Sequence, residues 1–190
     1  MHTLSLSFIL LSGFSVTACG QDVSSPPPPV QPDPPANSAN EPARGATVIL
    51  APTAGHATAG RLVLVQEDTG VRIRGEVTGL GPDREHAFHV HETGNCSAPD
   101  ASSAGEHFNP FDQLHGNPVN GPHHAGDMLN LRANSQGVAQ VDVLSASLTV
   151  GGSERTDVIG KALIVHANPD DYQSQPAGNA GDRLACGVIE

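Results

Sequence analysis

The sequence predicts an all-β domain in which short antiparallel strands form a sandwich or a flattened barrel. Runs rich in β-branched residues are separated by turn residues, which is typical of such folds. After the first 22 residues, no segment shows helical periodicity over a useful length. Two segments, 93–122 and 167–184, lack apolar periodicity, and we expect them to be long functional loops because structureless loops of that length are otherwise uncommon.

The first three expected strands begin at residue 46. Strands are predicted at 46–52 and 61–66, and the turn signal at 67–70 joins the second of them to a third in a hairpin. Apolar residues in this third strand alternate with charged ones, so one face should lie in the core and the other in water. The apolar residues of the third strand are Val71, Ile73 and Val77.

The fourth expected strand, 85–92, carries two histidines at a spacing of two. Side chains alternate between the faces of a strand, so His89 and His91 share one face while Phe88 and Val90 share the other. One face can therefore hold a metal while the other is buried. The last four strands are expected at 127–133, 138–150, 159–166 and 185–190, which makes eight in total.

Composition limits the partners that this protein can have. The 190 residues suit one domain with appendages, and a 3% aromatic content without Trp requires a core of Val, Leu, Ile and Ala. The formal net charge is -11 and Lys161 is the single lysine, which argues against nucleic acid because phosphate binding needs clustered cations. An anionic substrate would have to be attracted by a local positive field.

The N-terminal residues are typical of a bacterial export signal with a lipid-attachment site. An apolar run from Leu4 to Val16 leads into Thr17, Ala18 and Cys19, which predicts a signal peptide at 1–18 and lipidation of Cys19. An ordinary signal peptide with an incidental Cys19 is the alternative. Either reading predicts an extracytoplasmic protein of the cell envelope or periplasm, and the first adds the lipid anchor on Cys19 as its contact with a membrane.

The remaining chain divides into a proline-rich linker at 19–42 and a folded domain at 43–190. If Cys19 carries lipid, Cys96 and Cys186 remain as a pair in an oxidising compartment. A bridge between them would close a loop of about 90 residues and contribute about 4 to 5 kcal/mol in the chain-entropy model. Two free buried thiols are the alternative.

The predicted domain contains seven potential metal ligands, too many for one site and enough for two. Four imidazoles suit copper, whereas three imidazoles with one carboxylate form a tetrahedral set that suits zinc. A shared histidine could bind both metals, because its two ring nitrogens can each bind one. The seven residues are His89, His91, His107, His115, His124, Asp127 and His166.

An ordered set of motifs resembles the copper/zinc superoxide dismutases over nearly all of residues 46–189. The resemblance implies an eight-stranded antiparallel Greek-key β-barrel. It also implies an enzyme that converts two superoxide anions to dioxygen and hydrogen peroxide by cycling copper(II) and copper(I), with zinc as a structural partner, and that protects the cell envelope. The motifs are HVHETGNC, SAGEHFNP, HGNP, HHAGDMLNL, IGKALIVHA, DDY and GNAGDRLACGVI.

Carried over by position, the resemblance implies two metal sites joined by His107. The His-x-x-Asp spacing of the family selects His124 over the adjacent His123. His107 would be catalytic as well, because it can be protonated and can donate that proton during turnover. The copper ligands would be His89, His91, His107 and His166, and the zinc ligands His107, His115, His124 and Asp127.

Further residues match positions around these sites. Arg183 matches the arginine that guides the anion to copper, and its alternative role is a surface ion pair with Asp182. Asp170 matches the carboxylate that links a copper-site to a zinc-site histidine, although the adjacent Asp171 could turn inward instead. The resemblance also implies a disulfide between Cys96 and Cys186.

The sequence departs from the family around the channel through which the anion would reach copper. The segment 167–183 contains three aspartates and no lysine, whereas family members commonly place lysines there, so steering of the substrate would rest on Arg183. The oligomeric state does not carry over, and a homodimer stays open. Two other functions stay open at this point: a noncatalytic module that buffers or delivers copper, and an envelope lipoprotein in which zinc pins the long loop.

Overall fold

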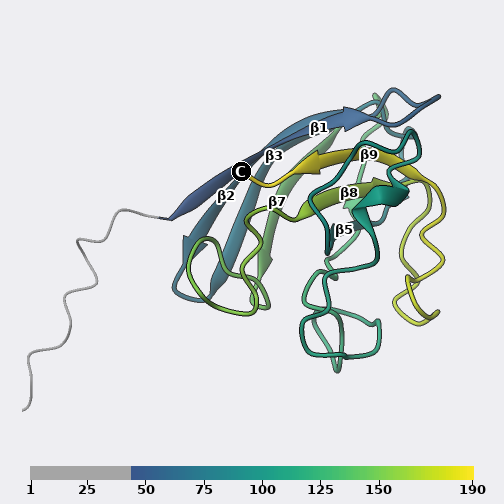
Figure 1. The fold of residues 1–190 in the computed structure, drawn as a ribbon. Coiled ribbons are helices and arrows are strands. Elements are labelled where there is room, and N and C mark those ends of the chain that lie inside the picture. The colour runs from purple at the N-terminus through teal and green to yellow at the C-terminus, as the bar shows by residue number, and fades with distance from the viewer. Residues whose placement is uncertain (1–43) are drawn as a thin grey trace, which may run out of the picture. The chain divides into compact units, whose positions relative to one another are not determined.

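Residues 44–190, the part of the chain that the computed structural model describes, contain nine strands and one short 3-10 turn (Figure 1). The predicted signal peptide, Cys19 and the proline-rich linker lie outside the described residues. Within the described part, no helix has the length and hydropathy to cross a membrane. The elements are β1 (Gly45–Pro52), β2 (Ala59–Glu67), β3 (Gly70–Thr78), β4 (Glu85–His86), β5 (Phe88–His91), η2 (Ser102–Ala104), β6 (Leu131–Arg132), β7 (Ala139–Ser145), β8 (Ala162–His166) and β9 (Arg183–Val188).

The strands form an antiparallel Greek-key barrel, as the sequence predicted. Seven of them follow the order β5-β8-β9-β1-β2-β3-β7, and β4 pairs separately with β6. Strands β4 and β5 are separated by Ala87 alone, yet they belong to different sheets. Because β6 pairs with β4 and lies beside β7, the two edges of the large sheet are brought together and the sheet curls into a barrel.

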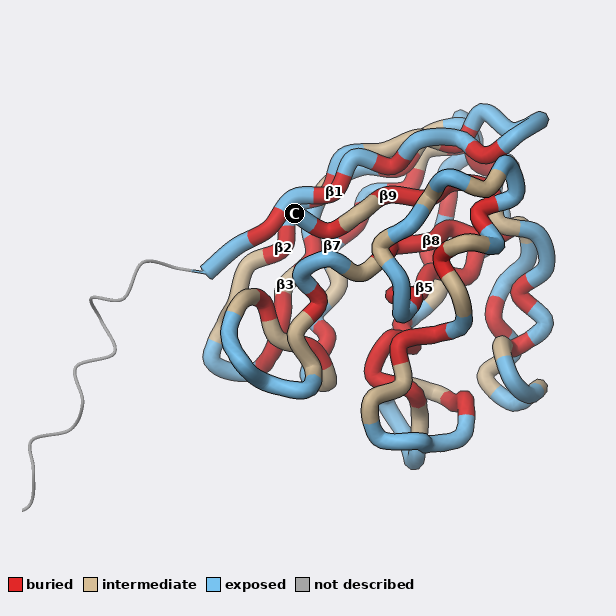
Figure 2. The backbone as a smooth tube through the Cα atoms, viewed as in Figure 1, coloured by how far each residue is buried: buried red, intermediate tan, exposed pale blue. Residues whose placement is uncertain are grey.

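The barrel interior is filled by alternate residues of each strand, as expected from the sequence. Val71, Ile73 and Val77 of β3 are fully buried, and the predicted hairpin joins β2 to β3 through Asp68 and Thr69. Figure 2 shows the same alternation of buried and exposed residues along β1. The hydrophobic core therefore lies inside the curled sheet.

Two predicted strands differ from the structure. The expected strand 85–92 is divided at Ala87, and only two residues of the expected strand 127–133 pair as β6. The polar groups just before β6 bond to loops instead of a neighbouring strand, since Asp127 accepts from the amides of Gly116 and His124. The remaining strands also differ at their ends: β7 ends at Ser145, β8 begins at Ala162 and β9 begins at Arg183.

Strand β5 separates the core from the histidine-rich face. All four of its residues are buried; Phe88 and Val90 pack in the main core. His89 and His91 point to the other face, where the long loops cover them. The prediction that one face of this strand is core and the other carries histidines is confirmed.

Three main-chain hydrogen bonds in a closed cycle hold the loops against β5. The amide of Val90 donates to the carbonyl of Gly126 (2.9 Å), Gly126 donates to Phe108 (2.9 Å), and Phe108 donates to Val90 (2.8 Å). A Cβ on Gly126 would lie 2.2 Å from the Val90 carbonyl oxygen, so this approach requires glycine. His89, His91, His107 and Asp127 are chain neighbours of the three residues in the cycle.

Replacing Gly126 by Ala should destabilise the domain by about 1 to 3 kcal/mol, because the added methyl group must push the cycle apart. Chemical denaturation of the metal-free domain would measure this. Gly45→Ala is the control, since a Cβ there lies 3.1 Å from the nearest atom, the carbonyl oxygen of Leu64. Equal midpoints for the two variants would show that the close approach at Gly126 does not matter.

Candidate metal centre

Seven side chains gather beside β5 in two groups that share His107. In each group, one ligand atom per residue lies within 4.8 Å of the others. All seven residues are buried, and His124 is the most exposed of them at 7%. The four-histidine group consists of His89, His91, His107 and His166, and the mixed group of His107, His115, His124 and Asp127.

Two members of the four-histidine group are oriented by main-chain carbonyls. Nδ1 of His91 lies 2.9 Å from the Gly105 oxygen, and Nδ1 of His166 lies 3.3 Å from the Gly181 oxygen. A carbonyl accepts only from a protonated nitrogen, so each Nε2 is left with a free lone pair. These two Nε2 atoms lie 3.4 Å apart and face each other.

Asp170 links the two groups. One of its oxygens accepts from Nε2 of His89 (2.8 Å) and the other from Nε2 of His115 (2.9 Å). Burial alone would raise the pKa of Asp170, but the hydrogen bonds from His115 and His89 outweigh it and lower the pKa. Asp170 is 3% exposed, whereas Asp171 is exposed and accepts from Ser174 within its own loop.

Two carboxamide side chains, which the sequence analysis did not identify, bond to the main chains of Asp170 and His115. Asn130 accepts from the amide of Asp170 (2.8 Å) and donates to its carbonyl (3.0 Å). Gln175 does the same for His115, at 3.0 Å and 2.9 Å. Tyr172 adds a third tie, since its hydroxyl accepts from the amide of Asn130 at 2.8 Å. Asn130 and Tyr172 lie within the recognised motifs HHAGDMLNL and DDY, whereas Gln175 lies in none of the motifs.

His123, the neighbour of His124, belongs to neither group. Its ring bonds to the Gly121 carbonyl and to the Ser147 hydroxyl, both at 2.9 Å. The ring of His124 instead places Nδ1 at 3.4 Å from Nδ1 of His107. His124, which the spacing selected, therefore belongs to the mixed group, whereas His123 bonds outside both groups.

The histidine nitrogens themselves show that the two groups suit metal cations. Nδ1 of His89 and Nε2 of His107 are buried and make no hydrogen bond, and Nδ1 of His115 lies 3.1 Å from Asp127 Oδ2 within the mixed group. A buried polar atom without a partner costs about 1 to 3 kcal/mol, which a bound cation would offset. His107 can serve both groups, because its Nδ1 lies 2.8 Å from Asp127 Oδ1 and its Nε2 is left for the four-histidine group.

Burial sets the protonation of these imidazoles. It lowers the pKa of His91 and His166, with neighbouring histidines adding to the effect, and lowers the pKa of His107 to about 4. Burial would also lower the pKa of His115, but hydrogen bonds with two carboxylates outweigh it and raise the pKa to about 9. A cation entering the mixed group must therefore displace a proton from His115.

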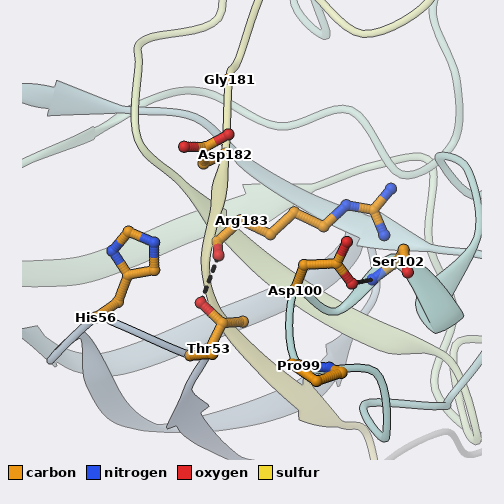
Figure 3. Close-up of a pocket in the computed structure, with 9 residues that line it drawn as sticks. Thr53, His56, Pro99, Asp100, Ser102, Gly181, Asp182 and Arg183 are labelled. Carbon is orange, nitrogen blue, oxygen red and sulfur yellow. Dashed lines mark hydrogen bonds between the residues drawn. The ribbon is translucent and has the colours of Figure 1, made fainter.

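A pocket of about 230 Å³ lies beside the four-histidine group and is lined by His91, His107, His166 and Arg183. Arg183 also lines a second pocket of about 480 Å³, whose wall includes Thr53, His56, Asp100 and Asp182 (Figure 3). The arginine therefore contributes to the lining of both pockets. Asp182 is exposed on the side of the second pocket, and none of the ion pairs found in residues 44–190 joins it to Arg183.

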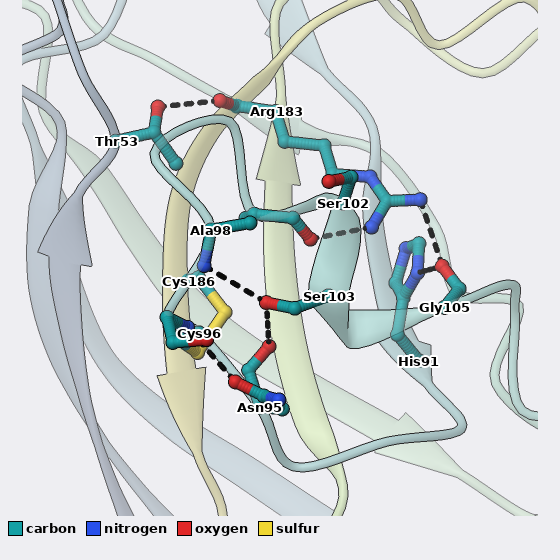
Figure 4. The surroundings of a disulfide bond; sticks show 12 residues. Thr53, His91, Asn95, Cys96, Ala98, Ser102, Ser103, Gly105, Arg183 and Cys186 are labelled. Atoms are coloured by element: carbon teal, nitrogen blue, oxygen red, sulfur yellow. Dashed lines mark hydrogen bonds between the residues drawn. A yellow bond between two sulfur atoms is a disulfide. The ribbon is translucent and has the colours of Figure 1, made fainter.

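Two neutral carbonyls hold the Arg183 guanidinium in place. Its two terminal nitrogens donate to the carbonyls of Ala101 and Gly105, each at 2.7 Å (Figure 4). These carbonyls belong to the loop that contains η2, and the disulfide between Cys96 and Cys186 ties this loop to β9. The predicted disulfide is thus present, and it anchors the segment on which the arginine rests.

Comparison with known proteins identifies the family. Residues 58–189 match the model of the family described as Copper/zinc superoxide dismutase (SODC). The chain belongs to this family. Superoxide dismutase [Cu-Zn] 1 of Aquifex aeolicus is 46% identical over 136 residues, covering 69% of this chain and 79% of that protein. The superoxide dismutase-like protein YojM of Bacillus subtilis is 33% identical over 194 residues, covering 100% of this chain and 96% of that protein.

Solved structures agree with this family. The crystal structure of a superoxide dismutase-like protein from Bacillus subtilis aligns with a TM-score of 0.69 and 33% sequence identity, covering 76% of this chain and 97% of that chain. The described strands and the two histidine groups therefore belong to a copper/zinc superoxide dismutase fold with ligand sets suited to both metals.

In this family member, replacing Asp170 by Asn should weaken zinc binding about 10- to 100-fold, the usual cost of losing a residue that orients metal ligands. An amide presents one acceptor where the carboxylate presents two, so one histidine loses its partner. Chelator competition with Zn²⁺ as the sole metal would measure the affinity. Asp171→Asn serves as the control, because that carboxylate bonds within its own loop. Unchanged zinc affinity in the Asp170 variant would contradict its orienting role.

Proposed function

We propose that this protein disproportionates superoxide, with one copper held by the four-histidine group and one zinc held by the mixed group. The observation that carries this proposal is the pair of complete ligand groups joined by His107, beside a pocket that Arg183 lines. Four imidazoles without a carboxylate suit copper, and three imidazoles with one carboxylate suit zinc. The described residues supply both sets in full.

The overall reaction consumes two superoxide anions and two protons and produces dioxygen and hydrogen peroxide. Copper held by His89, His91, His107 and His166 would supply the one-electron redox chemistry, accepting an electron from one superoxide and returning it to the next. Arg183 attracts the anion into the pocket, and the carbonyls of Ala101 and Gly105 orient its guanidinium. His107 lines the same pocket, and its Nε2, which faces the four-histidine group, would give a proton to the reduced substrate during turnover.

The protein acts outside the cytoplasm, and we propose that Cys19 anchors it to a membrane of the cell envelope through a lipid. The disulfide supports the first statement, since such bonds persist in oxidising compartments. The apolar run that ends at Cys19 supports the second. The proline-rich segment 19–42 would then act as a spacer between the membrane and the enzyme, which would protect the envelope from superoxide.

Replacing His89 by Ala should abolish superoxide dismutation while zinc stays bound, because His89 belongs to the four-histidine group alone. Activity and metal content would be measured on protein loaded with one copper and one zinc. His123→Ala is the matched control, since that histidine belongs to neither group. Undiminished activity in the His89 variant would refute the copper assignment. Two bound metals without activity in the unaltered protein would favour a role in copper handling.

Changing Cys19 to Ser should move the protein from the membrane fraction to the soluble fraction of the envelope, because the acceptor for lipid is removed. Mass spectrometry of the mature N-terminus of the unaltered protein should find lipid on Cys19. An unmodified mature N-terminus, or a Cys19 variant that stays with the membrane, would favour an ordinary signal peptide.

A further inference from the structure

The pocket beside the four-histidine group is lined by one cation and one carboxylate. These are Arg183 and Glu106, and the loop wall opposite them consists of neutral residues from Gln175 to Gly181. Of the three aspartates in that loop, Asp170 bonds two histidines, and the other two lie in their own turn or face the second pocket. Glu106 is therefore the one carboxylate in the lining of this pocket.

The position of Glu106 is fixed by its main chain, and its carboxylate is free. Its carbonyl accepts from the amide of Glu92 at 2.9 Å, and its own amide donates to a Glu92 carboxylate oxygen at 3.4 Å. Its neighbours in the chain are Gly105, which holds Arg183, and His107, which joins both metal-binding groups. Among residues 44–190, the Glu106 side chain makes neither a hydrogen bond nor an ion pair, and the residue is exposed.

We propose that Glu106 opposes the field of Arg183 at this pocket and weakens the capture of superoxide and other small monoanions. The proposal deepens the proposed function and rests on it. Glu106 acts through its charge and not by moving the arginine, because two neutral carbonyls at 2.7 Å already hold the guanidinium. Because the two opposite charges partly cancel at the pocket, the rate of anion capture should depend only weakly on salt concentration.

The test compares binding of azide, a small monoanion, to copper- and zinc-loaded protein, followed through the copper absorption spectrum. Glu106→Gln removes the charge and keeps the shape, and should tighten azide binding about two- to fivefold at low ionic strength. The difference should disappear near 1 M salt, where the Debye length is about 3 Å. Arg183→Gln should shift the affinity in the opposite direction.

Glu76→Gln is the matched control, since it removes the same charge from the outer face of β3, where Glu76 accepts from Gln140. It should leave azide binding unchanged. Equal shifts in the two glutamate variants would mean that net charge alone matters, and no shift in the Glu106 variant would overturn the proposal.

Measuring the rate of superoxide decay at increasing salt concentrations distinguishes a failure of this inference from a failure of the proposed function. The Glu106 variant should show a faster rate at low salt and a steeper fall with salt than the unaltered protein. If the loaded protein binds azide but does not consume superoxide, the proposed function fails, while the azide comparison still decides whether Glu106 opposes anions.

Discussion

The structure depends on one constraint: several imidazoles are buried together, and each must satisfy both of its ring nitrogens. Outer partners take one nitrogen of each ring in the four-histidine group apart from His107, whose two nitrogens face the two groups. The inward nitrogens of His89 and His107 have no hydrogen-bond partner among residues 44–190. Metal binding thus completes the polar interior, so metal occupancy and folding stability must be coupled.

The two long loops stay ordered because their hydrogen bonds are long-range. The cycle of Val90, Phe108 and Gly126 fixes the first loop to β5, and Gln175 joins the second loop to the first at His115. The Cys96–Cys186 disulfide spans 90 residues and fixes the start of the first loop to β9. A long segment without regular structure would otherwise lose too much entropy on folding to hold side chains in place.

The fold was predictable wherever burial follows a period of two, as in β1, β2, β3 and β7. The boundaries were not predictable around 127–130, where backbone and side-chain groups bond to residues that are distant in the sequence. The ligand set could be read from the order of the motifs. Asn130 and Gln175 could not, because a carboxamide that pairs with a distant main chain leaves no periodic or spacing signal. Such a pairing is decided by how the loops approach one another.

The acidic composition of the chain raises the question of how it attracts an anion. The answer depends on which groups the carboxylates near the pocket contact. A carboxylate paired with Arg183 would cancel the field of the guanidinium, but Ala101 and Gly105 hold it with neutral carbonyls, so its charge still acts on the pocket. The nearby aspartates are bonded to histidines or to their own loop, or face the second pocket. In a loop without lysine, the field over the substrate pocket therefore depends on which acidic residues line it, and Glu106 is the one acidic residue in that lining.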